Sequence, residues 1–261
     1  MSETWIWRGH ASYVWRFGQE RRLDAVQRHI SLEGRRILDV GCGIGTYVER
    51  LSQLSSQVHG IDVDRQRIRA GRERGLSLLA GTAEDLPFDD NSIDVVLLNE
   101  VIEHVRDDRQ ALEEALRVLR PGGDLVIFAP NRLYPFETHG AYFGDRFVFR
   151  LIPLVNYLPD RLRNRFCPHV RAYFRRDIRR LFVGLPAELH VHSYVYPGFD
   201  NIFHRSSILG TALRTVCYRL ESTPLRVFGL SHFVIARKLA STASHQDRDS
   251  GRVPATSAHG E

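Results

Sequence analysis

Short apolar runs recur along the first half of this chain, and the stretches between them are long enough for helices. They cover residues 37–40, 58–61, 95–98 and 124–131. Runs of this kind are typical of strands buried on both faces of a parallel sheet. Between the last two runs, Leu112, Ala115, Leu116 and Leu119 recur at helical spacing and predict a helix over residues 109–119. The pattern therefore predicts an α/β fold.

The pattern changes after residue 130. Prolines interrupt the apolar clusters of residues 131–172, and this segment is predicted to be an inserted helical cap. A helix over residues 175–182 and strands over 189–196 and 232–239 then resume the main pattern. Between these two strands we expect a helical excursion from about residue 203 to residue 220.

A glycine-rich turn follows the first apolar run. Gly41, Gly43 and Gly45 occupy alternate positions, and Asp39 lies just before them. Glycine allows a tight turn and lets the backbone approach a ligand closely. Dinucleotide dehydrogenases prefer a spacing that needs glycine at position 46, where Thr46 stands. The spacing therefore favours another nucleotide, and a strand-to-helix turn without a ligand is the alternative.

Asp62 ends the second run, about 20 residues after the first glycine. Doubly wound folds place an acid that binds ribose hydroxyls at this distance. The alternative is that Asp62 caps the next helix. Asp64 is better placed for that task, because it directly precedes the helix predicted over residues 65–74. Asp62 is therefore a candidate ribose ligand.

Three segments, the glycine turn among them, carry a family resemblance. They are the acid followed by G-x-G-x-G at 39–45, the segment L-L-A-G-T-A-E-D-L-P-F at 78–88 with D-D-N-S-I-D after it, and R-V-L-R-P-G-G-x-L-x-I-x-x-P-N at 117–131. Together they resemble the class I S-adenosylmethionine-dependent methyltransferases of the ubiquinone and menaquinone type. The resemblance implies a Rossmann-like, doubly wound sheet of seven mostly parallel strands with an antiparallel last strand. It also implies S-adenosylmethionine as cofactor.

The resemblance assigns residues to the cofactor. Thr82 replaces an acid that is usual at its position, so recognition of the adenine amino group is expected to shift to Glu84, Asp85 or the backbone of Ala83. The full set of expected cofactor contacts is Asp39, Gly41, Gly43, Gly45, Asp62, Val63, Thr82, Ala83, Glu84 and Asn99.

The chemistry is expected at the carboxyl ends of the fourth and fifth strands, where open α/β sheets bind ligands. Methyl transfer from a sulfonium is an in-line displacement in which the protein aligns the nucleophile and removes its proton. His104 is the expected base, because its reference pKa of about 6.5 lies near working pH. His139 is the second catalytic candidate.

The string E-x-x-E-H at residues 100–104 suggests a metal site. If the string is helical, Glu100 and Glu103 share one face, and His104 can turn toward the same point. The string resembles the metal-binding motif of ubiquinone-pathway O-methyltransferases and of small-RNA 2′-O-methyltransferases, which implies a divalent ion such as Mg²⁺ with His139 as fourth ligand. The alternative is that Glu103 only stabilises a helix start.

Composition agrees with one main domain. At 261 residues and 43% hydrophobic content, the chain can bury a full core. Residues 1–34 are expected to form a helical lead-in, residues 35–240 the methyltransferase domain, and residues 241–261 a disordered polar tail. The aromatic residues of the lead-in are expected to pack against the cofactor pocket; they are Trp5, Trp7, Tyr13, Trp15 and Phe17.

The location is expected to be cytoplasmic. No apolar stretch reaches the roughly 18 residues of a membrane span, and residues 1–22 lack the apolar core of a secretion signal. The three cysteines, Cys42, Cys167 and Cys217, are far apart, which favours a reducing compartment.

The net charge of +5 comes almost wholly from arginine. Between Arg146 and Arg180, arginines alternate with aromatic residues. This mixture suits phosphates, carboxylates or nucleic acid, and it also suits a helical lid resting near an anionic membrane. Solvated helix faces with arginine stems packed on aromatic rings are the other interpretation.

The acceptor is the least determined part. Tyr142, His169 and Tyr173 are the candidate substrate contacts, although core packing explains them equally well. A sugar, a glycolipid head group or a phenolic ring suits the polar residues of the cap, so O-methylation of such a small acceptor is the leading hypothesis. An RNA methyltransferase using the arginine stripe and a non-catalytic S-adenosylmethionine-binding protein are the alternatives. Nucleic acid is not the expected partner, because no separate RNA-binding module is apparent.

Overall fold

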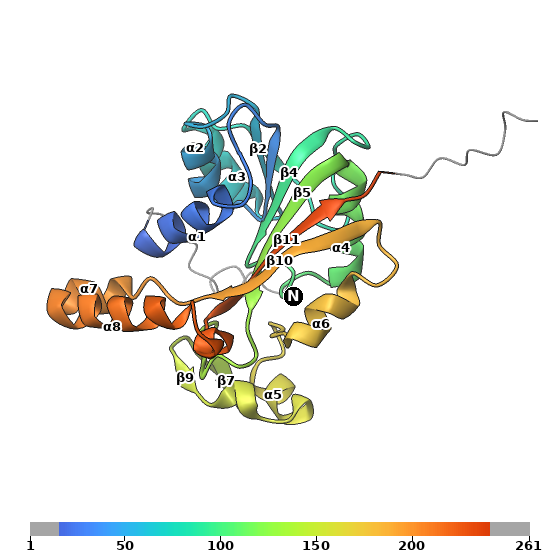
Figure 1. Cartoon of the computed structure of the whole chain (residues 1–261). Coiled ribbons are helices and arrows are strands. Elements are labelled where there is room, and N and C mark those ends of the chain that lie inside the picture. The colour runs from blue at the N-terminus through green and yellow to red at the C-terminus, as the bar shows by residue number, and fades with distance from the viewer. Residues whose placement is uncertain (1–15, 241–261) are drawn as a thin grey trace, which may run out of the picture.

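The computed structural model describes residues 16–240 and is built around one twisted sheet (Figure 1). The sheet has seven strands in the order β10-β11-β5-β4-β1-β2-β3. Only β11 runs against its neighbours, so the predicted sheet of mostly parallel strands with an antiparallel last strand is confirmed. The strands are β1 (Ile37–Val40), β2 (Val58–Asp62), β3 (Leu78–Ala80), β4 (Ile93–Asn99), β5 (Leu119–Pro130), β10 (Ala187–Val195) and β11 (Ser231–Lys238).

Helices cover both faces of the sheet, which is why its central strands are apolar on both sides. The helices that cover it are α1 (Phe17–Gln27), α2 (Thr46–Leu51), α3 (Arg65–Arg72), α4 (Asp108–Val118) and α6 (Arg175–Leu181). In β4, Val95 and Leu97 pack with α1, α2 and α3, whereas Val96 and Leu98 pack with α4 and α6 on the opposite face. The carboxyl ends of β1, β2, β4 and β5 therefore open at one edge, where the site lies.

The start of α3 and the end of α4 each have a local cause. Asp64 accepts hydrogen bonds from the backbone N–H groups of Gln66 (2.9 Å) and Arg67 (3.2 Å), and so starts α3 as predicted. Helix α4 ends one residue earlier than expected, because Leu119 pairs with Ile93. Strand β5 consequently begins at Leu119 and includes the R-P-G-G segment that was predicted to precede it.

The cap at residues 131–172 is mostly not helical, which corrects the prediction of a helical cap. Strand β6 (Phe136–Glu137) pairs with β9 (Ile152–Pro153), and β7 (Ala141–Phe143) pairs with β8 (Arg146–Val148). A 3₁₀ turn, η2 (Val155–Tyr157), and one short helix, α5 (Asp160–Phe166), complete it. Pro159 and Pro168 lie on either side of α5 and keep this helix short.

A buried arginine organises the cap. The Arg163 side chain is 1% exposed and donates to the Asn156 side chain (3.2 Å), the Val170 carbonyl (2.9 Å) and the Glu137 carboxylate (2.8 Å). These bonds join α5, η2 and β6 and satisfy a charge that would be costly if buried alone.

The helical excursion between β10 and β11 begins at residue 200, slightly before the predicted start. It consists of α7 (Asp200–Arg205), α8 (Ser207–Leu220) and the 3₁₀ turn η3 (Pro224–Phe228). Phe17 stacks on Tyr218 of α8 with ring centroids 6.3 Å apart, so it does not pack against the cofactor pocket as predicted. The four lead-in aromatic residues before Phe17 and the predicted tail at 241–261 lie outside the described residues. Between residues 16 and 240, every helix is too short or too polar to cross a membrane.

Candidate active site

The turn between β1 and α2 requires its glycines. Gly41, Gly43 and Gly45 have φ values of +74°, +59° and +84°, a region that side chains with a Cβ rarely adopt. A Cβ on Gly41 would lie 2.4 Å from the Cγ2 atom of Val101. The turn is thus held against the loop that follows β4.

Two buried acids lie at this turn. The Asp62 carboxylate accepts hydrogen bonds from the Gly43 N–H (2.9 Å) and the Asp64 N–H (2.8 Å), and so fixes the glycine turn to the end of β2. Asp39 is 2% exposed. Burial, and then the charge of Asp62, raise the pKa of Asp39 to about 8.

A cleft of about 720 Å³ opens beside the turn, within the usual size range of ligand pockets. Six predicted cofactor residues line it: Gly41, Asp62, Val63, Thr82, Ala83 and Glu84. The other four do not. Asp39 and Gly43 support the turn, Gly45 precedes α2, and the Asn99 side chain accepts a 2.5 Å hydrogen bond from Arg22.

The loop after β4 is not a helix, which corrects the basis of the predicted metal motif. Residues 100–106 form turns, and Glu100 has a φ of +58°. The Glu100 carboxylate pairs with Arg22 of α1 (2.6 Å) and accepts from the Ser231 hydroxyl of β11 (2.6 Å). Glu100 and Glu103 therefore do not share a helical face, and Glu100 is engaged by distant parts of the chain.

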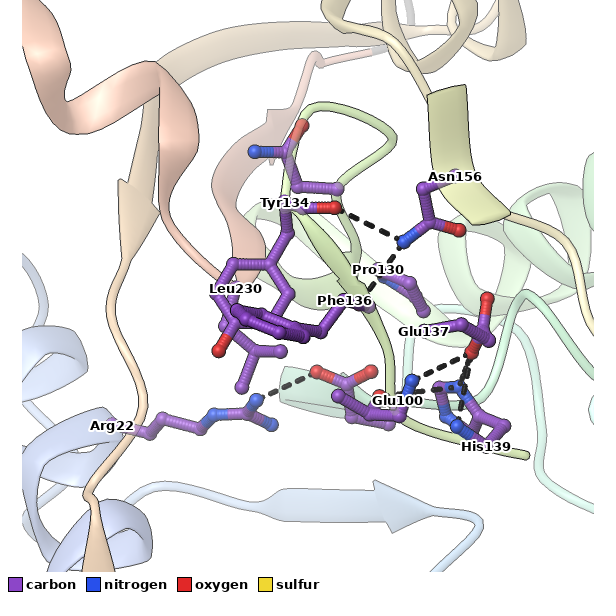
Figure 2. A pocket seen from close by; sticks show the side chains of 11 residues that line it. Arg22, Glu100, Pro130, Tyr134, Phe136, Glu137, His139, Asn156 and Leu230 are labelled. Atoms are coloured by element: carbon purple, nitrogen blue, oxygen red, sulfur yellow. Dashed lines mark hydrogen bonds and ion pairs between the residues drawn. The ribbon is translucent and has the colours of Figure 1, made fainter. Parts of the chain in front are cut away.

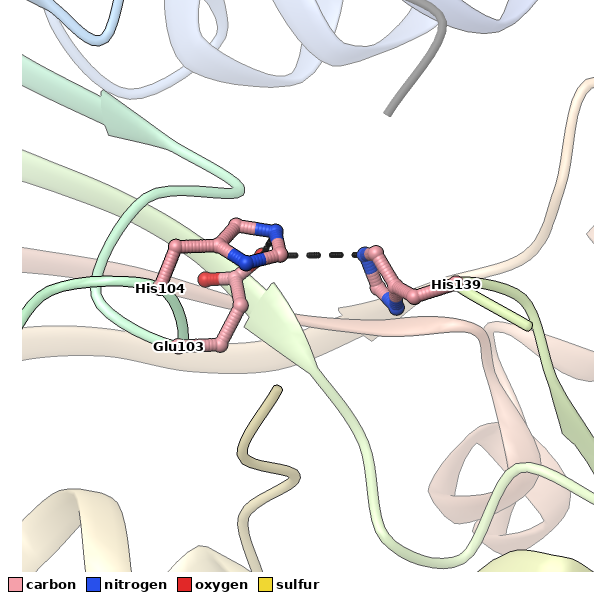
Figure 3. A group of neighbouring side chains, drawn as sticks. All are labelled: Glu103, His104 and His139. Carbon is pink, nitrogen blue, oxygen red and sulfur yellow. Dashed lines mark ion pairs between the residues drawn. The ribbon is translucent and has the colours of Figure 1, made fainter. Parts of the chain in front are cut away.

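The remaining three residues of the predicted metal set do converge (Figure 3). One ligand atom from each of Glu103, His104 and His139 lies within 4.8 Å of the others. Glu103 Oε1 is 3.9 Å from His104 Nε2 and 4.0 Å from His139 Nε2, and the two imidazole centroids are 5.2 Å apart. Two histidine nitrogens and a carboxylate thus face one point.

Glu103 is the most unusual member of this cluster. Its side chain is fully buried, yet neither carboxylate oxygen has a hydrogen-bond partner within residues 16–240. Burial, and then the charge of Glu100, raise the pKa of Glu103 well above its ordinary value. Buried carboxylates normally accept hydrogen bonds, so the two oxygens of Glu103 indicate a place where a ligand or ion can bind.

The histidines differ in their surroundings. Partial burial, and then neighbouring His139, lower the pKa of His104 to about 4, which keeps its imidazole neutral and able to bind a metal ion but makes it a weaker base than a free imidazole. His139 is oriented by Glu137, whose Oε1 atom accepts from His139 Nδ1 (3.0 Å) and from its backbone N–H (2.9 Å). With Nδ1 used in this way, Nε2 is the nitrogen directed at Glu103.

Glu137 was missed in the sequence, although its position two residues before His139 was a usable signal. Burial alone acts to raise its pKa, but the hydrogen bond from His139 and the charges around it lower that pKa to about 2.

Arg22 is a second residue that the sequence did not single out. It lies 77 residues from Asn99 and 78 from Glu100, so no local pattern connects them.

A second cavity of about 210 Å³ lies on the cap side of the loop after β4 (Figure 2). Its walls include Arg22, Tyr134, Phe136 and His139. Glu100 lines both this cavity and the larger cleft. Glu100 therefore lies between the two cavities, at the carboxyl end of β4.

The predicted substrate residues separate into three cases. His169 lines the large cleft, and its Nε2 atom is 3.2 Å from the His139 carbonyl oxygen. Tyr142 lines neither cavity and packs against His169 with ring centroids 5.8 Å apart. Tyr173 is buried, and its hydroxyl lies 3.0 Å from both the Ile102 carbonyl and the Asp108 carboxylate. Tyr173 is thus a structural residue, which corrects its assignment as a substrate contact.

Comparison with known sequences agrees with the glycine turn and the strands that follow it. Residues 38–127 match the family model described as "Methyltransferase domain". A ubiquinone biosynthesis O-methyltransferase of Xanthomonas oryzae is 34% identical over 139 residues, which are 51% of this chain and 58% of that protein. A demethylmenaquinone methyltransferase of Renibacterium salmoninarum is 36% identical over 147 residues, 53% of this chain and 59% of that protein. The chain thus matches less than two thirds of each relative.

Solved structures share the fold over more of the chain. An S-adenosylmethionine-dependent methyltransferase from Mesorhizobium loti aligns with a TM-score of 0.60 at 16% identity, covering 85% of this chain and 98% of the other. The [4+2]-cyclase SpnF aligns with a TM-score of 0.56 at 20% identity, covering 88% and 84%. At such identities the likeness concerns the fold alone. The cyclase among these structures shows that one fold can host different reactions.

Proposed function

We propose that this chain is an S-adenosylmethionine-dependent methyltransferase that transfers the methyl group to a hydroxyl oxygen of a small acceptor, and the match of residues 38–127 to a methyltransferase domain supports this. The observation that carries the proposal is that two cavities share Glu100 in their walls, one lined by His104 and the other by His139. A cofactor in one cavity and an acceptor in the other would have their reacting ends on either side of this shared wall residue, close enough to be aligned for an in-line displacement.

The large cleft fits the cofactor. Its wall at Gly41 has no room for a side chain, and the Asp62 carboxylate stands at the end of the neighbouring strand, where ribose hydroxyls are bound in doubly wound folds. Thr82, Ala83 and Glu84 offer the adenine contacts. When bound, S-adenosylmethionine supplies the electrophilic methyl group, and the residues of the cleft hold and orient it.

The small cavity favours a phenolic acceptor among the sugar, glycolipid and phenolic classes. Tyr134 and Phe136 form an aromatic wall, with ring centroids 5.8 Å apart. The amide group of Asn156 is already engaged, because it donates to the carbonyls of Tyr134 and Phe136. A cavity of about 210 Å³ with this lining suits one planar ring better than a polyhydroxylated sugar. The quinone-pathway names of the two relatives support the same class.

We further propose that Glu103, His104 and His139 bind a divalent metal ion. The orphaned, buried carboxylate of Glu103 and the orientation of His139 by Glu137 fit this role, whereas Glu100 is engaged by Arg22 and is left out of the ligand set. A divalent ion there would lower the pKa of the acceptor hydroxyl and orient its oxygen. Without an ion, His104 is the proton acceptor that this cluster offers to the hydroxyl, and its lowered pKa makes it a weak base for that step, so the lowered pKa favours its role as a metal ligand.

The test uses the full-length protein and S-adenosylmethionine with a labelled methyl group. Catechols and simple phenols, monosaccharides, a glycolipid extract and RNA are supplied in separate reactions, each with Mg²⁺ and with a chelator. We expect transfer to the phenolic oxygen and loss of that transfer on chelation. Cofactor binding without transfer to any class would refute the enzymatic proposal, and full activity after exhaustive chelation would refute the metal.

Two matched variants connect the activity with the site. His104→Ala should reduce turnover by at least about 100-fold, the effect of a lost general base. His190→Ala is the control, because its side chain is similarly exposed, 39% against 44%, but lies on β10 outside both cavities. Equal losses in both variants would remove His104 from the mechanism.

A further inference from the structure

The cap exposes an unusual set of large apolar side chains. Six of them lie within 20 residues of sequence, and each is at least 45% exposed: Phe143, Phe149, Leu151, Leu154, Tyr157 and Leu162. We call them the cap apolar set. Single exposed apolar residues are common on proteins, but a concentration of this size in one small element indicates an interaction surface.

The charge of the same segment is positive. Arg146, Arg150, Arg161 and Arg165 are all exposed, and none of them forms an ion pair within residues 16–240. The acids there are Asp145 and Asp160, and Asp160 is already paired with Arg132 (2.8 Å). Exposed arginines in this number, with one unpaired acid, complement an anionic surface.

Leu154 gives an independent sign that the exposure is not accidental. Its φ of +63° lies in the left-handed region, which is unfavourable for leucine, and its side chain is 59% exposed. The backbone N–H of Leu154 donates to the Pro135 carbonyl (2.7 Å), and so holds this conformation next to the acceptor cavity. Burial cannot be what compensates for the strained backbone at this position.

We propose that the cap docks onto the anionic surface of a lipid bilayer, with the cap apolar set inserted among the lipids and the four arginines at the head groups. Arginine and aromatic residues also suit RNA. Binding to RNA, however, does not bury exposed leucine side chains in an apolar environment, whereas insertion into a bilayer does. The cap supplies Tyr134, Phe136 and Asn156 to the acceptor cavity, so a docked cap brings that cavity to the membrane surface. In Figure 1 the cap lies at the lower end of the molecule, away from α2 and α3.

The experiment measures binding of the full-length protein to vesicles by sedimentation. Phosphatidylcholine vesicles with and without phosphatidylglycerol are compared, at low and high salt. We expect binding that requires phosphatidylglycerol and weakens with salt. The double variant Arg161→Gln with Arg165→Gln should lower the partition coefficient about 25-fold, from about five-fold per arginine near the surface. Leu151→Ser with Leu162→Ser should also lower it strongly.

Matched controls change the same residue types elsewhere. Arg69→Gln on α3 and Val183→Ser after α6 alter side chains that are 84% and 71% exposed, and they should bind vesicles as the unchanged protein does. Circular dichroism melting checks that every variant folds. Equal binding by cap variants and controls would overturn the proposal, as would binding to bulk RNA but not to anionic vesicles. The vesicle readout does not involve methyl transfer, so it stands or falls separately from the proposed activity.

Discussion

Glu137 and His139 form a hydrogen-bonded pair in the cap, with 3.0 Å between Glu137 Oε1 and His139 Nδ1. The pair leaves His139 Nε2 4.0 Å from the buried carboxylate of Glu103. The other oxygen of Glu137 accepts from Arg163 at 2.8 Å. The orientation of one imidazole of the candidate site therefore depends on a buried chain of charges that begins in α5.

Replacing Glu137 by glutamine should disorder this orientation without touching the cofactor cleft. We expect turnover to fall about 10- to 100-fold, the usual effect of losing a group that orients a metal-binding histidine. The dissociation constant of S-adenosylmethionine, measured by calorimetry, should stay unchanged. Asp160→Asn is the control, because it alters an exposed acid of the same cap. Normal turnover in Glu137→Gln would show that His139 needs no such support.

Arg22 joins α1 to the reacting edge through Asn99 (2.5 Å), Glu100 (2.6 Å) and Ser231 (2.9 Å). Arg22→Ala should leave the charge of Glu100 without its partner, and lower the free energy of unfolding by about 2 kcal/mol. It should also raise KM for both substrates, because Glu100 lines both cavities.

Arg21→Ala is the matched control for this change. Arg21 pairs with Glu221 at 2.7 Å and is similarly buried, but it lines neither cavity. Its loss should reduce stability comparably and leave KM unchanged. Steady-state kinetics together with denaturant unfolding separate the two effects, and similar KM values in both variants would contradict a role of Arg22 at the site.

Gly41→Ala should damage cofactor binding directly. The new Cβ would lie 2.4 Å from Val101, and the φ of +74° disfavours any side chain. We expect S-adenosylmethionine affinity to fall at least about ten-fold, equivalent to about 1.4 kcal/mol. Gly34→Ala is the control, because its φ of +65° carries similar backbone strain while its Cβ would meet no atom within 4 Å. Equal calorimetric affinities in the two variants would argue against the turn as a cradle.

The raised pKa of Asp39 predicts a pH dependence of stability. The folded protein retains this proton up to about pH 8, whereas the unfolded chain loses it near the ordinary value of 3.8. The folded state therefore binds more protons between these values, and its stability falls as pH rises through that window. Asp39→Asn should flatten this fall, as measured by melting at about pH 5 and about pH 8, while Asp145→Asn on the surface should not. An unchanged slope in Asp39→Asn would mean that the acid is ionised in the folded state.

Much of the fold follows from local sequence. The apolar runs, the glycines at 41, 43 and 45, and the Asp64 cap specify strands, a turn and a helix start through neighbouring residues, and the order of these elements predicts a doubly wound sheet. Because parallel strands end at one edge, the sequence also predicts that Asp62 and the loop containing His104 border the same cleft.

Only the tertiary structure decided which groups far apart in the sequence lie in contact. The E-x-x-E-H string is compatible with a helix, but Glu100 instead takes a positive φ to reach Arg22 and Ser231, 78 and 131 residues away. The sequence suggests Tyr173 as a substrate contact, but in the folded chain its hydroxyl is hydrogen-bonded to the Asp108 side chain. Backbone patterns report on neighbours within a few residues, whereas the pairing of buried charges depends on which distant side chains the folded core brings within hydrogen-bonding distance.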